Sequence, residues 1–292
     1  ETFSGDVWSV AVTPNDGYGD GETVLSNELT INTPPTVELK FPEKNHNTTN
    51  RLPTFNWSGT DIDGDGLTYQ LNLTCFYGSG LKCIERNRNY PGLIDNYTLI
   101  DSLECLYDFE ENYYYNWSVR AYDGGQWGPW ATPRRINIYS MVSIVLKTSS
   151  IDFGSMQFNE SNDTTNGNPG PFVIENDGNV FVNVTINGTN LWITNTNPTN
   201  NFTYKIDNYP GESSPPAFTF ASSQTSWSPV PSYSSLELAI AHLNWSNATD
   251  TAKIDVFIRA PGTVEPPGSK QSTIYFTASL DENPQDFIFF GE

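Results

Sequence analysis

Basic residues are scarce in this chain of 292 residues. Lysine and arginine number 14 against 34 aspartates and glutamates, which gives a formal net charge of −20. Nucleic acid and anionic membrane surfaces both attract a basic protein surface, so the composition argues against either as a partner. No apolar run approaches the roughly 18 residues of a membrane-spanning helix. We therefore expect no nucleic-acid binding and no membrane insertion in this chain.

Histidine is rarer still, with only His46 and His242 in the whole sequence. The first lies in an Asn/Thr loop and the second in an apolar stretch, so neither suggests a Ser/His/Asp or Cys/His catalytic arrangement. No glycine-rich phosphate loop is present, and no pair of carboxylates stands out. The sequence therefore predicts a protein that is not an enzyme.

Cysteine is limited to Cys75, Cys83 and Cys105, which permit one disulfide and leave one thiol over. A Cys75–Cys83 bridge would close a short glycine-containing loop, whereas a Cys75–Cys105 bridge would join two inward strand positions. The C-x-x-C spacing of zinc and redox motifs is missing. We predict one disulfide, with its pairing left open.

What the sequence does contain is alternation. Nearly every apolar stretch alternates with period two, and Gly, Pro, Asn or Asp separates the stretches. No convincing amphipathic helix is present, although Ser234–His242 fits either a helical turn or a strand. The pattern predicts an all-β chain of tandem β-sandwiches.

A pattern near the N-terminus recurs 109 residues later, the separation of Trp8 and Trp117. Each copy has a Trp-Ser-Val strand, then an Asp-Gly pair, then an alternating apolar strand, at Leu29–Ile31 and Ile136–Ile138 respectively. Some eighty residues of strand-like sequence precede the second copy within its domain, but only seven residues precede the first. We therefore predict that residues 1–33 are the last two strands of a partial sandwich, a possible donor hairpin that needs partner strands.

Residues 34–140 have the pattern of one complete sandwich. Its penultimate strand places Tyr115, Trp117, Val119 and Ala121 on one face, and Trp57 stands on an early strand. This pattern resembles a fibronectin type III domain, and the resemblance extends in part to residues 1–33. It implies a fold and almost nothing about function. The expected strands are Val37–Phe41, Pro53–Trp57, Leu67–Cys75, Leu103–Phe109, Tyr113–Tyr122 and Arg135–Tyr139.

Residues 141–284 predict a second, immunoglobulin-like β-sandwich, followed by an apolar strand or tail at 285–292. A Pro/Gly turn at Pro261–Gly268 between two alternating strands resembles the closing hairpin of Ig-like repeats in prokaryotic cell-surface proteins. The Asp177-Gly178 pair predicts another hairpin. The expected strands are Val142–Lys147, Phe172–Glu175, Val180–Asn187, Phe202–Ile206, Lys253–Arg259 and Ser272–Ser279.

Acceptor sequons for N-linked glycans are frequent. Several of these asparagines lie between apolar neighbours, as Asn56 does between Phe55 and Trp57, so strand alternation turns the asparagine outward. Acidity, sequons and Ig-like repeats together resemble archaeal-type cell-surface glycoproteins, which implies N-linked glycans and an extracellular location; ordinary polar strand and turn positions are the alternative. The sequons are at Asn47, Asn56, Asn72, Asn96, Asn116, Asn159, Asn162, Asn183, Asn187, Asn201, Asn244 and Asn247.

A possible calcium loop begins at Asp61, where Asp61, Asp63 and Asp65 are followed by Gly66. Carboxylates at positions 1, 3 and 5 and glycine at 6 open a D-x-D-x-D-G loop. Position 12 is Asn72 instead of the expected glutamate, and a plain acidic turn explains the same residues. Calcium is therefore a possible cofactor, and the sequence indicates no other.

The features combine into a structural function. We expect a non-enzymatic extracellular protein that joins copies of itself head-to-tail into a filament, sheath or lattice by β-strand complementation. One alternative is a fragment of an adhesin or stalk whose upstream strands complete residues 1–33. Another is a carbohydrate-binding module that uses Trp127 and Trp130. The expected assembly residues are Trp8, Val10, Val12, Leu29, Ile31, Phe287, Ile288, Phe289 and Phe290.

Overall fold

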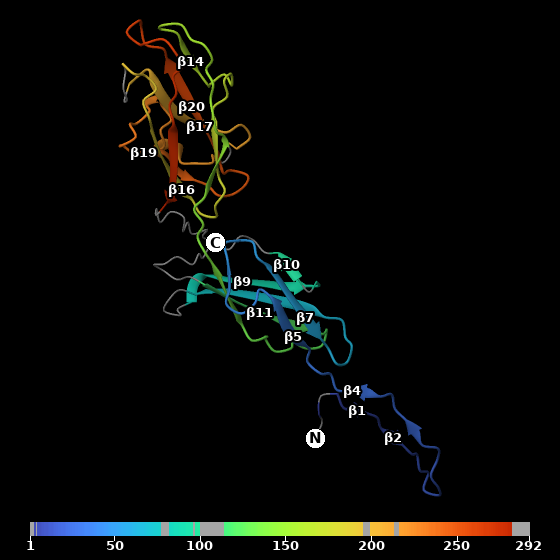
Figure 1. The fold of residues 1–292 in the computed structure, drawn as a ribbon. Helices are drawn as coiled ribbons and strands as arrows, with labels where there is room; N and C mark the ends of the chain where they lie inside the picture. The colour runs from blue at the N-terminus through green and yellow to red at the C-terminus, as the bar shows by residue number, and fades with distance from the viewer. Residues whose placement is uncertain are drawn as a thin grey trace. The chain divides into compact units, whose positions relative to one another are not determined.

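The computed structural model describes residues 3, 5–76, 82–95, 97–99, 114–194, 199–212 and 216–281. These residues form β-strands and connections, with one 3₁₀ turn at Phe220–Ser222 as their only helical element, so the predicted all-β class is confirmed. The chain divides into two compact units, Glu1–Tyr139 and Ser140–Glu292 (Figure 1).

Unit 1 contains a complete sandwich of two sheets. One sheet has the strand order β10–β7–β5 and the other β6–β12–β11–β8–β9, with β6 and β12 parallel and the other neighbours antiparallel. Strands β6, β9 and β10 were not predicted, and the strand expected at 103–109 lies outside the described residues. The strands are β5 Thr36–Phe41, β6 His46–Thr48, β7 Thr54–Thr60, β8 Thr68–Phe76, β9 Lys82–Leu93, β10 Tyr97–Leu99, β11 Tyr114–Tyr122 and β12 Arg134–Ile138.

Alternation along these strands builds the core of the sandwich. The inward residues of β7, β8 and β11 are fully buried, and the Trp117 ring meets the Phe55 ring edge-to-face at 5.1 Å across the two sheets. Such an aromatic contact requires both sheets to be present. The buried residues include Phe55, Trp57, Leu71, Leu73, Tyr115, Trp117, Val119, Ile136 and Ile138.

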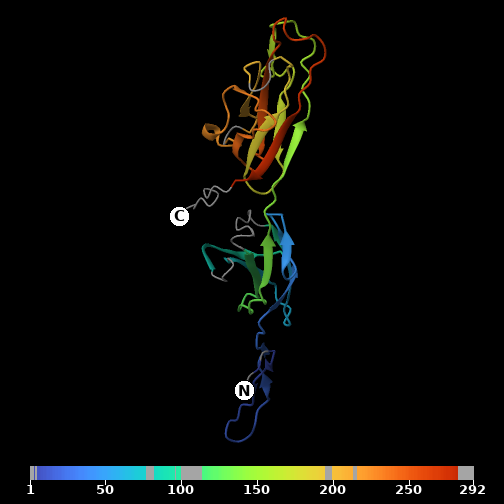
Figure 2. The ribbon, with the colours of Figure 1, turned by 60° about the vertical axis from the view of Figure 1, so that its left-hand side comes forward.

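Unit 2 is a second sandwich with unequal sheets (Figures 1 and 2). The larger sheet has the order β13–β15–β20–β17–β18, with β14 also paired to β20, and the smaller sheet has the order β19–β16–β21. The strands are β13 Ile144–Thr148, β14 Ser161–Asp163, β15 Phe172–Asn176, β16 Val182–Gly188, β17 Phe202–Asn208, β18 Ser228–Pro229, β19 Glu237–Leu243, β20 Thr251–Arg259 and β21 Ile274–Leu280.

Both hairpins predicted for unit 2 are wrong. Strands β15 and β16 lie in opposite sheets, and so do β20 and β21, so each connection crosses the sandwich. At the first crossing, a Cβ on Gly178 would lie 2.2 Å from the carbonyl oxygen of Met141, which explains the glycine by close approach. Turn residues and alternation look the same whether the chain returns to its own sheet or crosses to the facing one. The ambiguous Ser234–His242 segment overlaps strand β19, so its strand interpretation is correct.

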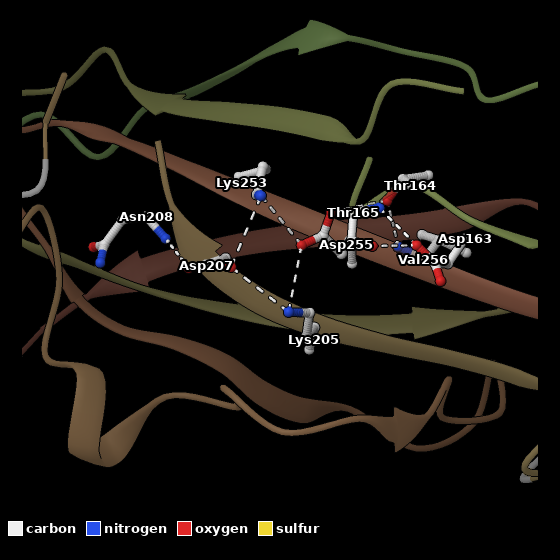
Figure 3. A network of polar contacts seen from close by, with 9 residues as sticks. All are labelled: Asp163, Thr164, Thr165, Lys205, Asp207, Asn208, Lys253, Asp255 and Val256. Carbon is white, nitrogen blue, oxygen red and sulfur yellow. Dashed lines mark hydrogen bonds and ion pairs between the residues drawn. The ribbon is translucent and has the colours of Figure 1, made fainter. Parts of the chain in front are cut away.

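A polar network covers part of the outer face of the larger sheet (Figure 3). The Asp255 side chain on β20 is fully buried, and the Thr164 hydroxyl donates a hydrogen bond of 2.9 Å to Asp255 Oδ1. The ammonium groups of Lys253 and Lys205 lie 3.4 and 3.8 Å from Asp255 Oδ2. These contacts fasten the residues after β14 onto β20 and β17, so the buried carboxylate has a structural explanation.

Candidate assembly interface

Residues 5–31 form one long hairpin, drawn in blue in Figures 1 and 2. Strand β1 (Val7–Trp8) pairs with β4 (Leu29–Thr30), and β2 (Ala11–Val12) pairs with β3 (Val24–Leu25). Backbone hydrogen bonds connect the two pairs, for example from Ser26 N–H to the carbonyl oxygen of Val10 at 2.8 Å. The N-terminal residues therefore adopt the two-stranded form that the sequence predicts.

The turn of this hairpin matches the turn between β11 and β12. In each, one aspartate Oδ1 accepts N–H bonds from the residues two and three positions later, and a glycine with positive φ follows the aspartate. These bonds lower the pKa of both carboxyls, chiefly through the Tyr18 amide for Asp16 and the Gln126 amide for Asp123. The donors are Tyr18 and Gly19 in the hairpin, and Gly125 and Gln126 in the sandwich.

The matching turns correct the predicted offset of the repeat. Asp16 and Asp123 are 107 residues apart, and the pairs Trp8–Leu29 and Tyr115–Ile136 agree with the same offset. The predicted equivalence of Trp8 with Trp117 is therefore wrong by two residues, which keeps every side chain on its predicted face. The structural counterparts of Trp8, Val10, Val12, Leu29 and Ile31 are Tyr115, Trp117, Val119, Ile136 and Ile138.

The hairpin residues and their counterparts in the sandwich differ in the exposed fraction of their side chains. The five counterparts in the sandwich are 0% exposed, whereas Trp8 is 48% exposed and Val10 is 60% exposed. Val12 and Leu29 are also exposed, and Ile31 at the base is half-buried. Within the described residues, no strand covers the face that is buried in the intact copy. This bare apolar face is the candidate interface.

The hairpin exposes further apolar residues that were not predicted, among them Val24 and Leu25 on its return strand. Val24 lies directly opposite Val12 and extends the same face, while Leu25 lies opposite Ala11 on the other face. Their signal in the sequence was the hairpin register, which places a residue of the return strand across from each residue of the first.

The base of the hairpin is anchored to the sandwich of unit 1. The Asn32 side-chain amide donates to Asp123 Oδ2 at 2.8 Å, and the Gln126 side-chain amide donates to the Asn32 carbonyl oxygen at 3.2 Å. The Thr33 N–H donates to Asp63 Oδ2 at 2.6 Å. These anchors were not predicted, because the bonded residues are 30 to 94 positions apart in the sequence.

Two of the three predicted calcium ligands, Asp61 and Asp63, accept backbone hydrogen bonds. Asp61 Oδ1 accepts the N–H groups of Asp63 and Asp65 at 2.9 and 3.1 Å, while Asp63 binds Thr33. No group of three His, Cys, Asp or Glu residues is placed to hold a metal ion in the part of the chain that the structure describes. The geometry fits an acidic turn between β7 and β8.

Some predicted glycan acceptors donate a hydrogen bond from the side-chain nitrogen Nδ2, the atom to which an N-linked glycan attaches. Asn187 is buried and donates from Nδ2 to the Tyr233 carbonyl oxygen at 2.7 Å. Asn183 Nδ2 donates to Asp281, and Asn244 Nδ2 donates to Thr249. These three side chains are not presented for attachment in the folded units.

Other acceptors lie at the surface. Asn47, Asn56, Asn159 and Asn247 are exposed, and Asn72, Asn116, Asn162 and Asn201 are half-buried, whereas Asn96 lies outside the described residues. The neighbours of Asn56, Phe55 and Trp57, are fully buried, as strand alternation predicts. Glycan attachment at these positions remains a prediction.

Cys75 is buried on β8 and belongs to a disulfide. The side chains of its two candidate partners, Cys83 and Cys105, lie outside the described residues, as do the apolar residues 287–290. The pairing therefore stays a prediction, and so does the C-terminal segment as an assembly strand.

The tryptophans of the carbohydrate-binding alternative are used in packing. The Arg120 guanidinium carbon lies 4.3 Å from the centroid of the Trp127 ring and 4.7 Å from that of Trp130. One cation thus contacts both rings, which accounts for the aromatic pair by cation–π packing on the surface of the sandwich.

No protein-family profile and no curated protein matches the chain. Among solved structures, it is similar to the FN1–FN3 domains of chicken CNTN1 at 11% identity, with 92% of this chain and 75% of that chain covered and a TM-score of 0.27. It is also similar to an α-L-rhamnosidase from Aspergillus terreus at 7% identity, with 85% and 29% covered and a TM-score of 0.26. No helix within the described ranges is long and apolar enough to cross a membrane. At these scores the fold class rests on the strands themselves.

Proposed function

We propose that this protein is a non-enzymatic, extracellular structural subunit, and that copies join through β-strand complementation at residues 1–33. The observation that carries the proposal is the hairpin whose counterpart is fully buried in the intact sandwich, while its own apolar face is exposed. A two-stranded hairpin with such a face gains stability only when further strands cover it. Donation from one copy to the next is head-to-tail and open-ended, which generates fibres or lattices.

Three chemical features support an extracellular location: a disulfide, the acidic net charge and the exposed sequons. A disulfide at Cys75 persists best in an oxidising compartment, and the net charge of −20 keeps separate subunits soluble. Exposed sequons at Asn56 and Asn247 supply positions for N-linked glycans. We therefore place the protein at a cell surface, with other copies of itself and its glycans as partners.

A second candidate function follows from the matching turns. The hairpin has the register and the turn bridge of β11–β12, so preceding strands of a longer chain could complete it as a full domain. The protein would then be a stalk or adhesin of tandem sandwiches. The mass of the mature protein separates the two: about seventy or more additional upstream residues would favour the stalk.

Polymerisation of the full chain tests the main proposal. We expect filaments or sheets of the wild-type protein in electron micrographs, and monomers for Val10→Asp, because a carboxylate on the donated face opposes burial. Ser9→Asp is the matched control, since it adds the same charge at a neighbouring position on the other face. A wild-type protein that stays monomeric, or a Val10→Asp variant that polymerises normally, would contradict the proposal.

A further inference from the structure

The sandwich of unit 2 is open along one side. Its smaller sheet ends at β21, which pairs only with β16 within the described residues, whereas the larger sheet continues past β15 to β13. The rings of Phe172 on β15 and Phe276 on β21 are in contact at 5.7 Å, so β21 faces β15. Strand β13 then lies opposite the place where the smaller sheet has no further strand.

Burial shows the same opening. Inward side chains of β16 and β20, such as Val184 and Ile254, are fully buried. The inward side chains of β13 and β21, including Leu146 and Ile274, are only half-buried. A closed sandwich would bury both groups equally, so one edge of this core lacks its cover.

A cavity of about 1120 Å³ lies at one end of this edge, where Leu146 of β13 and Ile274 of β21 are among its lining residues. It exceeds the roughly 300–1,000 Å³ of small-molecule pockets, which suits a length of polypeptide better than a small ligand, and its walls combine apolar side chains with polar ones such as Gln157 and Gln271. Glu265 holds the loop at its mouth by accepting hydrogen bonds from Ile193 and Thr194 and pairing with Lys270. The lining includes Leu146, Phe172, Trp192, Phe202, Ile258 and Ile274.

The backbone of β21 is ready for another strand. The Thr189 N–H donates to the Thr273 carbonyl oxygen, and the Asp281 N–H donates to that of Phe181, so the odd-numbered residues of this strand bond toward β16. In an antiparallel ladder the alternate residues then point their N–H and C=O groups to the other side. Phe276 and Ala278 therefore direct theirs to the open edge.

We propose that this groove receives the strand Val7–Val12 of a second copy, paired to the open edge of β21. The inference rests on the proposed function and names its acceptor. A donor of six residues spans about 20 Å, close to the seven residues of β21 at roughly 3.3 Å each. Trp8, Val10 and Val12 would face the uncovered side of the core, and the end of the segment beside Ile274 would reach the cavity.

Charge also favours this pairing. Neither Val7–Val12 nor β21 contains a charged residue, although the whole chain carries −20. Two copies can therefore meet along these strands without bringing carboxylates face to face. In the described part of unit 1, β11 and β12 already occupy the positions that a donated hairpin would match.

A complementation experiment with full-length chains tests the acceptor. Ala278→Pro removes an edge-facing N–H without touching the bonds to β16, and Ala278→Ser is its matched control. The Val10→Asp variant keeps the acceptor edge of β21 but cannot donate its N-terminal segment. The Ala278→Pro variant can donate its N-terminal segment, but its acceptor edge is blocked. We expect each variant alone to be monomeric, Ala278→Ser to polymerise, and an equimolar mixture of the two variants to form capped 1:1 dimers in sedimentation velocity.

Normal polymerisation of folded Ala278→Pro would overturn the acceptor and leave the proposed function intact, since Val10→Asp judges that function separately. If Ala278→Pro loses its folded circular dichroism spectrum, Phe158→Glu at the cavity and Leu238→Glu at the opposite edge of the sheet replace it. Both side chains are about half exposed, at 47% and 45%. If these two variants polymerise equally, the groove beside β21 is not the acceptor. Loss of polymerisation in Phe289→Asp but not in Val10→Asp would reassign the donor to the C-terminal segment.

Discussion

The N-terminal hairpin and the β11–β12 pair have the same register, the same aspartate-capped turn and similar apolar positions, yet only the second is buried. Their turns share the two bonds to the capping aspartate, and the Gly21 N–H bond to Pro14 corresponds to the Gly128 N–H bond to Ala121. The short-range pattern is therefore sufficient to form the hairpin and its turn. Burial depends on strands from elsewhere, which the sandwich has and residues 1–33 lack.

The largest difference in unfolding free energy is expected between a substitution in the buried aromatic core and one at the equivalent exposed position of the hairpin. Trp117→Ala removes the ring that packs on Phe55 and should destabilise unit 1 by about 3–5 kcal/mol. Val10→Ala at the equivalent hairpin position should change the unfolding free energy of the monomer by less than about 0.5 kcal/mol. Denaturant unfolding followed by far-UV circular dichroism measures both. Similar losses for the two variants would show that the hairpin face is covered in the monomer.

A smaller difference in stability is expected between alanine substitutions at Gly128 and Gly21, which occupy equivalent positions in the two turns. A Cβ on Gly128 would lie 1.9 Å from the Pro35 carbonyl oxygen, whereas a Cβ on Gly21 would meet the Pro14 ring at 2.9 Å. Gly128→Ala forces backbone to move and should cost roughly 1–3 kcal/mol. Gly21→Ala needs a shift of the exposed Pro14 ring and a small adjustment at the Pro14 carbonyl oxygen 3.3 Å away, both in the exposed hairpin, so unit 1 should keep its stability within about 0.5 kcal/mol in thermal unfolding. A neutral Gly128→Ala would contradict the close approach.

Sequence patterns were informative where the deciding contacts are short-range. Alternation placed Tyr115, Trp117 and Val119 on the buried face, and the Asp-Gly pairs marked both turns of the repeat. The two-residue error in the repeat offset arose because matching tryptophans were aligned, although the structural counterpart of Trp8 is a tyrosine. Period-two alternation tolerates that error, since it changes no side chain's face.

Patterns failed where the choice of sheet decides the outcome. The Asp177-Gly178 turn and the Pro261–Gly268 turn both carry the chain to the facing sheet, and nothing in the flanking alternation distinguishes that from a hairpin. Asn187 is buried, and its side-chain amide donates to the carbonyl oxygen of Tyr233, 46 residues away. Alternation along the strand does not reveal such a contact. The open edge at β21 was unpredictable for the same reason: it depends on how many strands each sheet contains.

The smallest effect concerns the two capping aspartates. Their folded-state pKa values lie below the ordinary 3.8, so each contributes stability above its unfolded-state pKa and loses it as the pH falls through the lower folded value. We expect nuclear magnetic resonance titration to find both carboxyls below the usual range. Asp123→Asn should flatten the acid-side decline in the stability of unit 1, because Asp123 also binds Asn32 at the base of the hairpin. Asp16→Asn should leave that decline unchanged in the monomer, since its turn closes a hairpin that no other strand covers, and an equal effect of the two variants would contradict this separation.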